Sequence, residues 1–305
     1  MININIETHP LLYTDYRAGL DFLKTLHAAP STHTQDSTLF HIYTEVNTDK
    51  EVECIKSFLA TQNLEKCKLI VWSDYDINDH PPIQPYKKYV DFRVWNPRKE
   101  AIGTPLENSG WLLADDSKHY MKSGVLRFLA TYNYGGIWAD MDMIFLNDFY
   151  PLLDQEWAYM WGSETDFINH GPCAALMNIH RHSDHALLCL NKMIEVPSNG
   201  SFEGSTVLDH RLLAKVYAAK PFAVFPSSFF NTEWLISKTD EPLSRQTESN
   251  WFSNIDNSAA NNLFLDAFAW HWHHSSNKDK IVETGSKFEL LRRRTDTLLK
   301  NKGII

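Results

Sequence analysis

The position of one helical pattern between two apolar segments constrains the fold of this chain most strongly. Residues 39–43 and 68–72 are short apolar runs with the length and composition of buried strands. Thr48 and Glu51 match the capping box that begins a helix, and apolar residues recur at helical spacing across residues 52–59. A strand, a helix and a second strand at this spacing make a βαβ unit, which predicts an α/β fold with a parallel sheet.

The next segments of the chain continue this alternation of strands and helices. A helix over residues 117–132 is expected to end at Gly135 and Gly136, because glycine adopts the left-handed cap conformation at little cost. The other expected elements are strands at 90–95, 137–139 and 222–225, helices at 183–194 and 287–302, and a long polar loop at 237–258.

The length of 305 residues suits one large domain with appended segments. We expect an N-terminal extension over residues 1–38, a catalytic core over residues 39–275 and a basic C-terminal helix within residues 276–305. The charge run of that helix is more typical of a solvated face than of a lipid anchor.

Composition and charge narrow the class of protein. The chain is 43% hydrophobic and 22% charged, as in soluble globular proteins, and its net charge of -9 argues against nucleic acid as a partner. The sequence has no signal-peptide pattern and no apolar stretch of the ~20 residues that a transmembrane helix needs. The four cysteines lack metal or disulfide-scaffold spacing and are interpreted as reduced thiols. A cytoplasmic location is expected, with peripheral attachment to a membrane left open.

Two carboxylates mark the candidate site. Asp140 and Asp142 follow the strand expected at residues 137–139, and ligands of open α/β sheets bind beyond the carboxyl ends of strands. Carboxylate oxygens suit Mg²⁺ or Mn²⁺, which can bridge both phosphates of a nucleoside diphosphate. Asp-x-Asp alone is a common pattern, and a turn with solvated acids also explains it. The glycine pair before it and the apolar run after it favour a functional site.

The surroundings of the Asp pair resemble a known family. The pattern is similar to the DXD sugar-binding region of the α-1,4-galactosyltransferase and initiating α-mannosyltransferase family, whose members are retaining enzymes with a nucleotide-binding GT-A fold. The residues that carry this resemblance are Ser123, Arg127, Gly135, Gly136, Trp138, Asp140 and Asp142.

Further segments resemble the α-1,4-galactosyltransferase branch in the same order along the chain. They are the run from Tyr43 to Asn47, the Gly103-Thr104-Pro105-Leu106-Glu107 stretch, Phe225-Pro226-Ser227 with Trp234, and Ala269-Trp270-His271. The resemblance covers about residues 39 to 275 and is most specific at the DXD block.

The resemblance implies a GT-A fold, with a Rossmann-like open mixed sheet flanked by helices in a single large domain. It implies a metal-dependent transfer of a hexose from a nucleotide-sugar donor, UDP-linked by preference, to a glycan or glycolipid acceptor. The site residues that it suggests are Asp140, Asp142 and His271 for Mn²⁺ or Mg²⁺, Ser123, Arg127 and Asn169 for donor sugar or phosphate, Thr44 and Trp138 near the nucleoside, and Glu203 for stabilising positive charge on the sugar.

The chain departs from this family at informative places. Members usually carry Asp where this sequence has Gly124, and that Asp is thought to bind hydroxyls of the donor sugar. The identity of the donor sugar is therefore open. Enzymes of the branch are Golgi membrane proteins with disulfides, whereas neither feature is expected here.

Alternative interpretations remain at this stage. His271 and His273 would share a strand face and could instead hold zinc. A haloacid-dehalogenase-type phosphatase also uses Asp-x-Asp after a strand, but it continues to a Thr where this chain has Ile144. A non-catalytic protein that binds sugar nucleotides or glycans is the other alternative, suggested by Gly124 and by the content of 10 Trp, 12 Tyr and 17 Phe.

Overall fold

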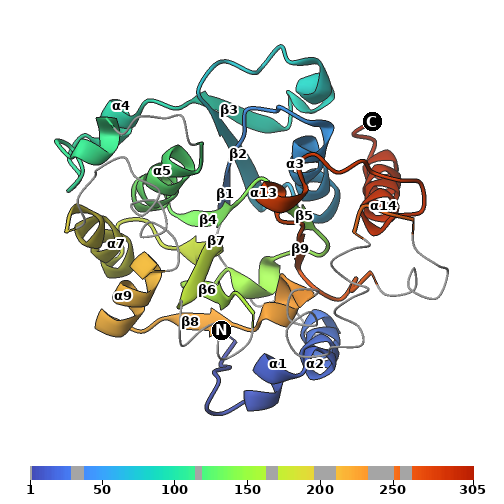
Figure 1. The fold of residues 1–305 in the computed structure, drawn as a ribbon, viewed down its shortest axis with the longest axis horizontal. Helices are drawn as coiled ribbons and strands as arrows, with labels where there is room; N and C mark the ends of the chain where they lie inside the picture. The colour runs from blue at the N-terminus through green and yellow to red at the C-terminus, as the bar shows by residue number, and fades with distance from the viewer. Residues whose placement is uncertain are drawn as a thin grey trace.

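A central sheet organises the chain (Figure 1). The computed structural model describes residues 2–28, 38–113, 119–162, 171–195, 211–232, 251–254 and 263–305. The sheet has seven strands in the order β3-β2-β1-β4-β7-β6-β8. Its strands are β1 (Thr38–Tyr43), β2 (Cys67–Ser73), β3 (Val90–Val94), β4 (Gly136–Ala139), β6 (Trp157–Met160), β7 (Pro172–Ile179) and β8 (Ala223–Phe225).

The sheet is mixed, as the predicted fold class requires. β1 pairs in parallel with β2 and with β4, and β2 pairs in parallel with β3. β7 runs antiparallel to β4 and β6, whereas β6 and β8 are parallel. The carboxyl ends of β1, β2 and β4 therefore meet at one edge of the sheet, where Asp140 directly follows β4.

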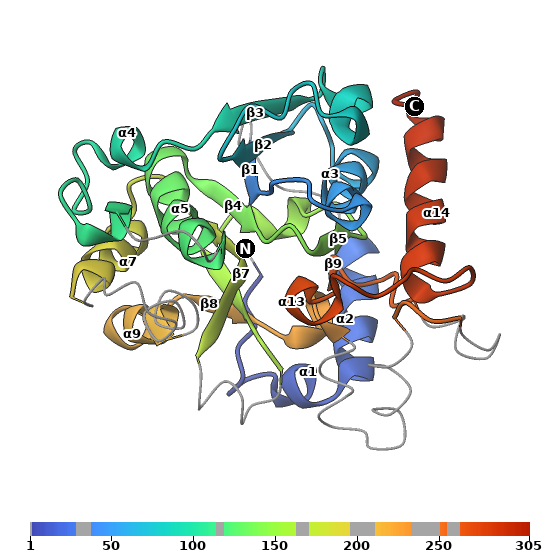
Figure 2. The ribbon, with the colours of Figure 1, turned by 45° about the horizontal axis from the view of Figure 1, so that its top comes forward.

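Helices cover both faces of the sheet (Figures 1 and 2). One face packs against α2 and α3, with Leu23 and Phe58 in its core, and the other packs against α5, α7 and α9, with Leu126 and Leu190 in its core. The described helices are α1 (Pro10–Thr14), α2 (Tyr16–Ala28), α3 (Asp49–Thr61), α4 (Pro97–Ala101), α5 (His119–Tyr134), α7 (Asp184–Ile194), α9 (Leu212–Ala219), α13 (His274–Asn277) and α14 (Lys287–Asn301). Short 3-10 turns are η1 (Pro81–Tyr86), η2 (Gly110–Leu113), η3 (Tyr150–Leu152) and η5 (Ser227–Phe229).

A two-stranded sheet connects the middle of the chain with its C-terminal part. β5 (Met143–Phe145) pairs antiparallel with β9 (Ala269–His271), so that Met143 lies opposite His271. These strands and α14 share a third apolar cluster, which includes Ile144, Trp270 and Phe288. No helix in the described part of the chain is long and apolar enough to cross a membrane.

The expected C-terminal helix is present as α14, and some of its charged side chains pair with α3. Lys56 of α3 contacts Asp296 at 2.7 Å, and Arg292 contacts Glu53 of α3 at 3.1 Å. Lys302 donates to backbone carbonyl oxygens at the end of α3. The charges of this helix therefore join α14 to α3 and do not form one continuous solvated face.

The start of α3 differs from the expected capping box. Thr48 is the N-cap residue, but its side chain makes no cap hydrogen bond to the helix backbone. Glu51 reaches past the cap instead, where its Oε2 accepts from the Thr44 hydroxyl at 2.6 Å and from the Asn47 amide at 3.2 Å. The carboxylate therefore shapes the loop after β1 rather than closing the helix on itself.

The glycine pair ends α5 as expected. Gly135 has a φ of 70° and its amide donates to the Thr131 carbonyl, while Gly136 has a φ of 100°. A Cβ atom at Gly136 would lie 2.1 Å from the Leu39 carbonyl oxygen of β1. Only glycine lets the chain turn from α5 directly into the parallel ladder beside β1, and that turn places Asp140 at the edge of the sheet.

We expect Gly136→Ala to destabilise the protein far more than Gly103→Ala. Both residues have positive φ, which costs an alanine about 1–2 kcal/mol, but a Cβ at Gly103 meets nothing within 4 Å. Only Gly136→Ala adds a clash with backbone. Urea unfolding of the two variants checks this, and equal losses in the free energy of unfolding would contradict it.

His41 joins the first strand to the same glycine turn. It is fully buried in β1, where its Nδ1 accepts from the Trp72 indole at 3.3 Å and its Nε2 lies 3.0 Å from the Gly135 carbonyl oxygen. The neutral ring therefore carries its proton on Nε2 and donates it to Gly135. Burial lowers the pKa of His41 to about 4, against the smaller opposing effect of the hydrogen bond to Gly135.

This lowered pKa predicts a loss of stability in acid. Between the unfolded pKa of 6.5 and the folded value of about 4, the unfolded chain binds a proton that the folded chain excludes. Stability should fall across this window by up to about 3 kcal/mol from His41 alone. Urea unfolding at about pH 7 and about pH 5 should show a smaller pH effect in His41→Gln than in the wild type. If the loss of stability between the two pH values is the same in His41→Gln as in the wild type, His41 is not its source.

Candidate active site

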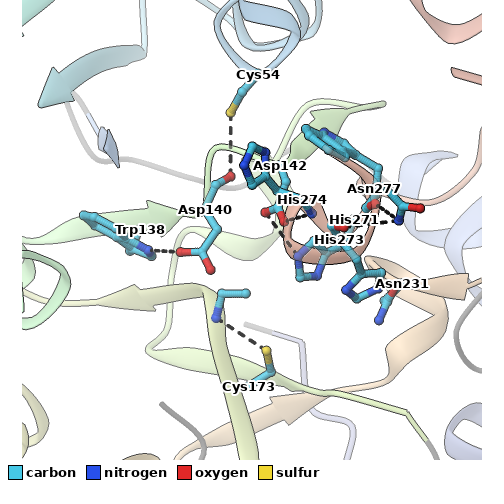
Figure 3. Close-up of polar contacts among 12 residues, drawn as sticks. Cys54, Trp138, Asp140, Asp142, Cys173, Asn231, His271, His273, His274 and Asn277 are labelled. Atoms are coloured by element: carbon cyan, nitrogen blue, oxygen red, sulfur yellow. Dashed lines mark hydrogen bonds and ion pairs between the residues drawn. The ribbon is translucent and has the colours of Figure 1, made fainter. Parts of the chain in front are cut away.

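The Asp140 carboxylate is held by two donors. Its Oδ1 accepts from the Trp138 indole at 2.7 Å (Figure 3). It also accepts from Arg127 Nη2 at 2.8 Å. The Asp140 amide donates to the Ala175 carbonyl of β7 at 2.7 Å, which fixes the backbone beside the reversed strand. The Asp140 side chain keeps 29% of its surface exposed, so it is held in place and still reachable from solvent.

Asp142 is more deeply buried than its partner. Its Oδ2 accepts from the His274 amide at 2.7 Å, and its Oδ1 faces His271 Nε2 across 3.1 Å. His271 is thus the partner of Oδ1, and the His274 amide is the partner of Oδ2. Burial alone would raise the pKa of Asp142, but the adjacent His271 together with the His274 amide holds that pKa well below its usual range.

The β5–β9 ladder brings His271 to the Asp pair. Its last residue pair joins Met143 to His271, and the Trp272 amide donates to the Asp142 carbonyl at 3.0 Å. The His271 ring is buried, with its Nδ1 3.1 Å from the hydroxyl of Tyr159. One nitrogen of the ring therefore points to a carboxylate and the other to a buried phenol.

The segment after His271 is fixed by its own contacts (Figure 3). His273 has a φ of 53° and its Nε2 lies 3.2 Å from Asn231 Oδ1. Asn277 donates to the Trp272 carbonyl at 2.8 Å, and Lys50 donates to the Asn277 carbonyl at 2.8 Å. Lys50 also donates to the Lys278 and Lys280 carbonyls, so a buried ammonium of α3 holds the end of α13.

The described residues around His271 and His273 do not form a zinc site with three or more His, Cys, Asp or Glu ligands. The His271 and His273 rings do lie side by side, with centroids 4.0 Å apart. Within the described ranges, however, no three His, Cys, Asp or Glu side chains are grouped so that they could hold a metal ion.

The remaining candidate residues occupy different places. Thr44 is buried at the end of β1, where its hydroxyl donates to Glu51 and accepts from the Val46 amide at 2.9 Å. Ser123 lies on α5, one turn before Arg127. Trp138 is fully buried, so it acts through Asp140 and offers no ring face to a ligand. Asn169 and Glu203, with the loop expected at 237–258 except for residues 251–254, lie outside the described residues.

The Asp142–His271 pair fits a divalent cation. The carboxylate oxygen and the imidazole nitrogen lie 3.1 Å apart, so one cation beside them could contact both. An aspartate oxygen and an imidazole nitrogen are both ordinary ligands of Mn²⁺, and two protein ligands suffice where a substrate diphosphate completes the shell. The pair is thus suited to a cation that arrives with phosphates, not to a closed protein cage.

Sequence reasoning missed several residues that shape this site. Tyr159 and Cys54 carry no motif, and Lys50 appeared only as part of the capping box. Cys54 lies beneath the turn, with its thiol 3.9 Å from the Asp140 carbonyl. The burial of Cys54 could be read from its place on the apolar face of α3, but its contact partner could not.

Residues 48–159 match the family model described as a glycosyltransferase sugar-binding region containing a DXD motif. The matched segment runs from the start of α3 into β6 and contains Arg127, the glycine pair and both aspartates. No curated protein gives a significant match to the sequence.

The chain was also compared with solved glycosyltransferase structures. The apo form of GlyE from Streptococcus pneumoniae TIGR4 has a TM-score of 0.50 at 11% identity, over 88% of this chain and 63% of that chain. The galactosyltransferase LgtC, in complex with donor and acceptor sugar analogs, has a TM-score of 0.45 at 12% identity, over 88% of this chain and 100% of that chain. The PaToxG glycosyltransferase has a TM-score of 0.45 at 11% identity, over 68% of this chain and 75% of that chain. The likeness to GlyE concerns the fold alone, and the two scores of 0.45 are too low to define a shared fold.

The match over residues 48–159 and the likeness of the fold to GlyE agree with the GT-A fold and the DXD region that the resemblance predicted. This part of the chain thus carries the DXD sugar-binding region of a glycosyltransferase family. The match to a sugar-binding region also sets it apart from the phosphatases considered from the sequence.

We expect the four cysteines to be unreactive in the folded protein. All four are buried and none forms a disulfide, and burial raises the pKa of Cys54 and raises that of Cys67 to about 12. Thiolate is the reactive form, so a thiol reagent should modify none of them in native buffer and all of them in denaturant. Rapid modification of any one before unfolding would contradict this.

Proposed function

We propose that this enzyme transfers a hexose, with retention of configuration, from a UDP-linked donor to a glycan or glycolipid acceptor, with Mn²⁺ or Mg²⁺ at Asp142 and His271. The observation that carries the metal assignment is the buried Asp142–His271 pair, in which a carboxylate oxygen and an imidazole nitrogen face each other across 3.1 Å. The DXD family match supports the nucleotide-sugar donor, and the retaining outcome rests on the family resemblance.

The two aspartates take different roles in this proposal. Asp142 is buried and paired with His271, so it is the direct cation ligand. Asp140 has one oxygen already occupied by Trp138 and Arg127, and its partly exposed carboxylate is placed to bind ribose or to reach the cation through water. The cation, when bound, neutralises the charge that develops on the leaving diphosphate.

Arg127 orients the donor in this arrangement. Its guanidinium is buried between Asp140 and the Trp138 ring, 5.5 Å from the ring centroid, and its charge lies next to the expected diphosphate. The planar fork can bind phosphate or sugar hydroxyls while it keeps Asp140 in place. Ser123 of the same helix, Thr44 and Asn169 complete the proposed donor contacts, and Glu203 is the proposed stabiliser of positive charge on the sugar.

The decisive experiment replaces Asp142 with Asn. The variant keeps the shape but removes the charge that holds the cation, and losing one preorganised electrostatic interaction typically lowers kcat by ~10²–10³. We expect EDTA-sensitive hydrolysis of UDP-hexoses at saturating donor to fall by this amount, with a smaller loss in Asp140→Asn. Asp79→Asn, which removes a 91%-exposed side-chain charge, is the matched control and should keep full activity.

The burial of Asp142 changes one expectation from the sequence. A turn with solvated acids would contribute little to stability, but Asp142 is 8% exposed and paired with His271. Breaking such a pair leaves a buried partner uncompensated, so Asp142→Asn should also unfold at lower temperature. Kinetics must therefore be measured where circular dichroism shows the variant folded. Full activity there, or wild-type turnover indifferent to EDTA, would exclude this mechanism and favour a protein that only binds sugar nucleotides.

A further inference from the structure

A buried tyrosine stands behind the proposed cation ligand. Tyr159 is fully buried in β6, and its hydroxyl lies 3.1 Å from His271 Nδ1. A β-bulge lies between Ala158 and Tyr159, where the register of β6 against β7 shifts and Tyr159 comes opposite Cys173. Bulges re-aim side chains next to active sites, and here the re-aimed residue reaches a histidine of the other sheet.

The tyrosine hydroxyl has a second partner. It also forms a hydrogen bond with the Cys173 side chain, whose sulfur accepts from the Ala175 amide at 3.4 Å. The contacts form a chain that runs from Cys173 through Tyr159 to His271 Nδ1, and from His271 Nε2 to Asp142 Oδ1. Each link joins a buried side chain, so none can exchange its partner for bulk water without a change in structure.

The chemistry of a metal-binding imidazole fixes the proton positions along this chain. A cation at Nε2 needs a lone pair there, so the ring proton must be on Nδ1. Nδ1–H then donates to the Tyr159 oxygen, which leaves the phenol proton for a different acceptor. Cys173 supplies that acceptor, because sulfur can take a weak hydrogen bond from a hydroxyl.

We propose that Tyr159, supported by Cys173, is a positioning residue that holds His271 in the tautomer and orientation needed to present Nε2 to the cation. This inference rests on the proposed function, because it assigns a role toward the cation at Asp142 and His271. Partners behind a metal-binding histidine typically change metal affinity by about 10–100-fold when they are lost.

Tyr159→Phe tests the inference directly. It removes the acceptor for Nδ1–H and keeps the ring that packs in β6. Mn²⁺ titrated into the full chain saturated with UDP, with free Mn²⁺ followed by electron paramagnetic resonance, should bind about 10–100-fold more weakly than in the wild type. UDP affinity measured without metal should stay the same, since Tyr159 contacts only the histidine side of the site.

Tyr13→Phe is the matched control. Tyr13 is equally buried, and its hydroxyl donates to the Val224 carbonyl at 2.7 Å, away from the Asp pair. Both variants lose one buried hydroxyl and its hydrogen bond, so a general loss of stability would appear in both. Only Tyr159→Phe should weaken Mn²⁺ binding. Cys173→Ser, which keeps an acceptor for the phenol, should bind Mn²⁺ like the wild type, and Cys173→Ala more weakly.

A second readout observes the ring itself. Long-range proton–nitrogen correlation spectra of the Mg²⁺–UDP complex should place the His271 proton on Nδ1 in the wild type. Equal Mn²⁺ affinity in Tyr159→Phe and Tyr13→Phe overturns the role of Tyr159 while the metal site stands. A proton on Nε2 overturns the role of Tyr159 and also removes His271 as a cation ligand. Failure of the wild type to bind Mn²⁺ in the presence of UDP would instead overturn the proposed function.

Discussion

The contact between the Asp142 turn and the histidine segment is the constraint on which the site depends. Asp142 and His274 are 132 residues apart in sequence, yet the Asp142 carboxylate accepts from the His274 amide and faces the His271 ring. The β5–β9 ladder holds these parts together, and Lys50 and Asn277 fix the backbone that follows. The large sheet places the Asp pair at its edge, and the small β5–β9 sheet brings His271 to it.

Two different electrostatic environments result from one short turn. Asp140 is balanced by the fixed charge of Arg127 and by an indole dipole, whereas Asp142 is balanced by an imidazole. An arginine stays charged at every accessible pH and keeps its carboxylate permanently compensated. An imidazole can instead share the carboxylate with a metal ion. Asp140 and Asp142 are separated by one residue. The charge of Asp140 is always balanced by Arg127, whereas the imidazole that balances Asp142 can share it with a metal ion.

Much of this arrangement follows from local sequence. The βαβ unit, the end of α5 at Gly135 and the place of the Asp pair after β4 are set by periodicity, glycine conformation and strand ends, which act over a few residues. The capping-box expectation for Glu51 was wrong because a buried Thr44 hydroxyl competed for the same carboxylate. The reversal of β7 and the partners of His271 could not be predicted from patterns, because they depend on pairing between distant segments. His271 entered only through the family resemblance, and Tyr159 through no pattern at all.

The distance along the chain between the Asp turn and its histidines also orders events during synthesis. A ribosome completes β1, α3, β2, β3, α5 and β4 well before it reaches His271, so the parallel half of the sheet can form on the nascent chain. Through that interval the Asp142 carboxylate has neither the His271 ring nor the His274 amide. This edge of the sheet is thus among the last parts of the molecule to be assembled, and an incomplete chain that already holds its parallel strands still lacks the histidine half of the proposed cation site.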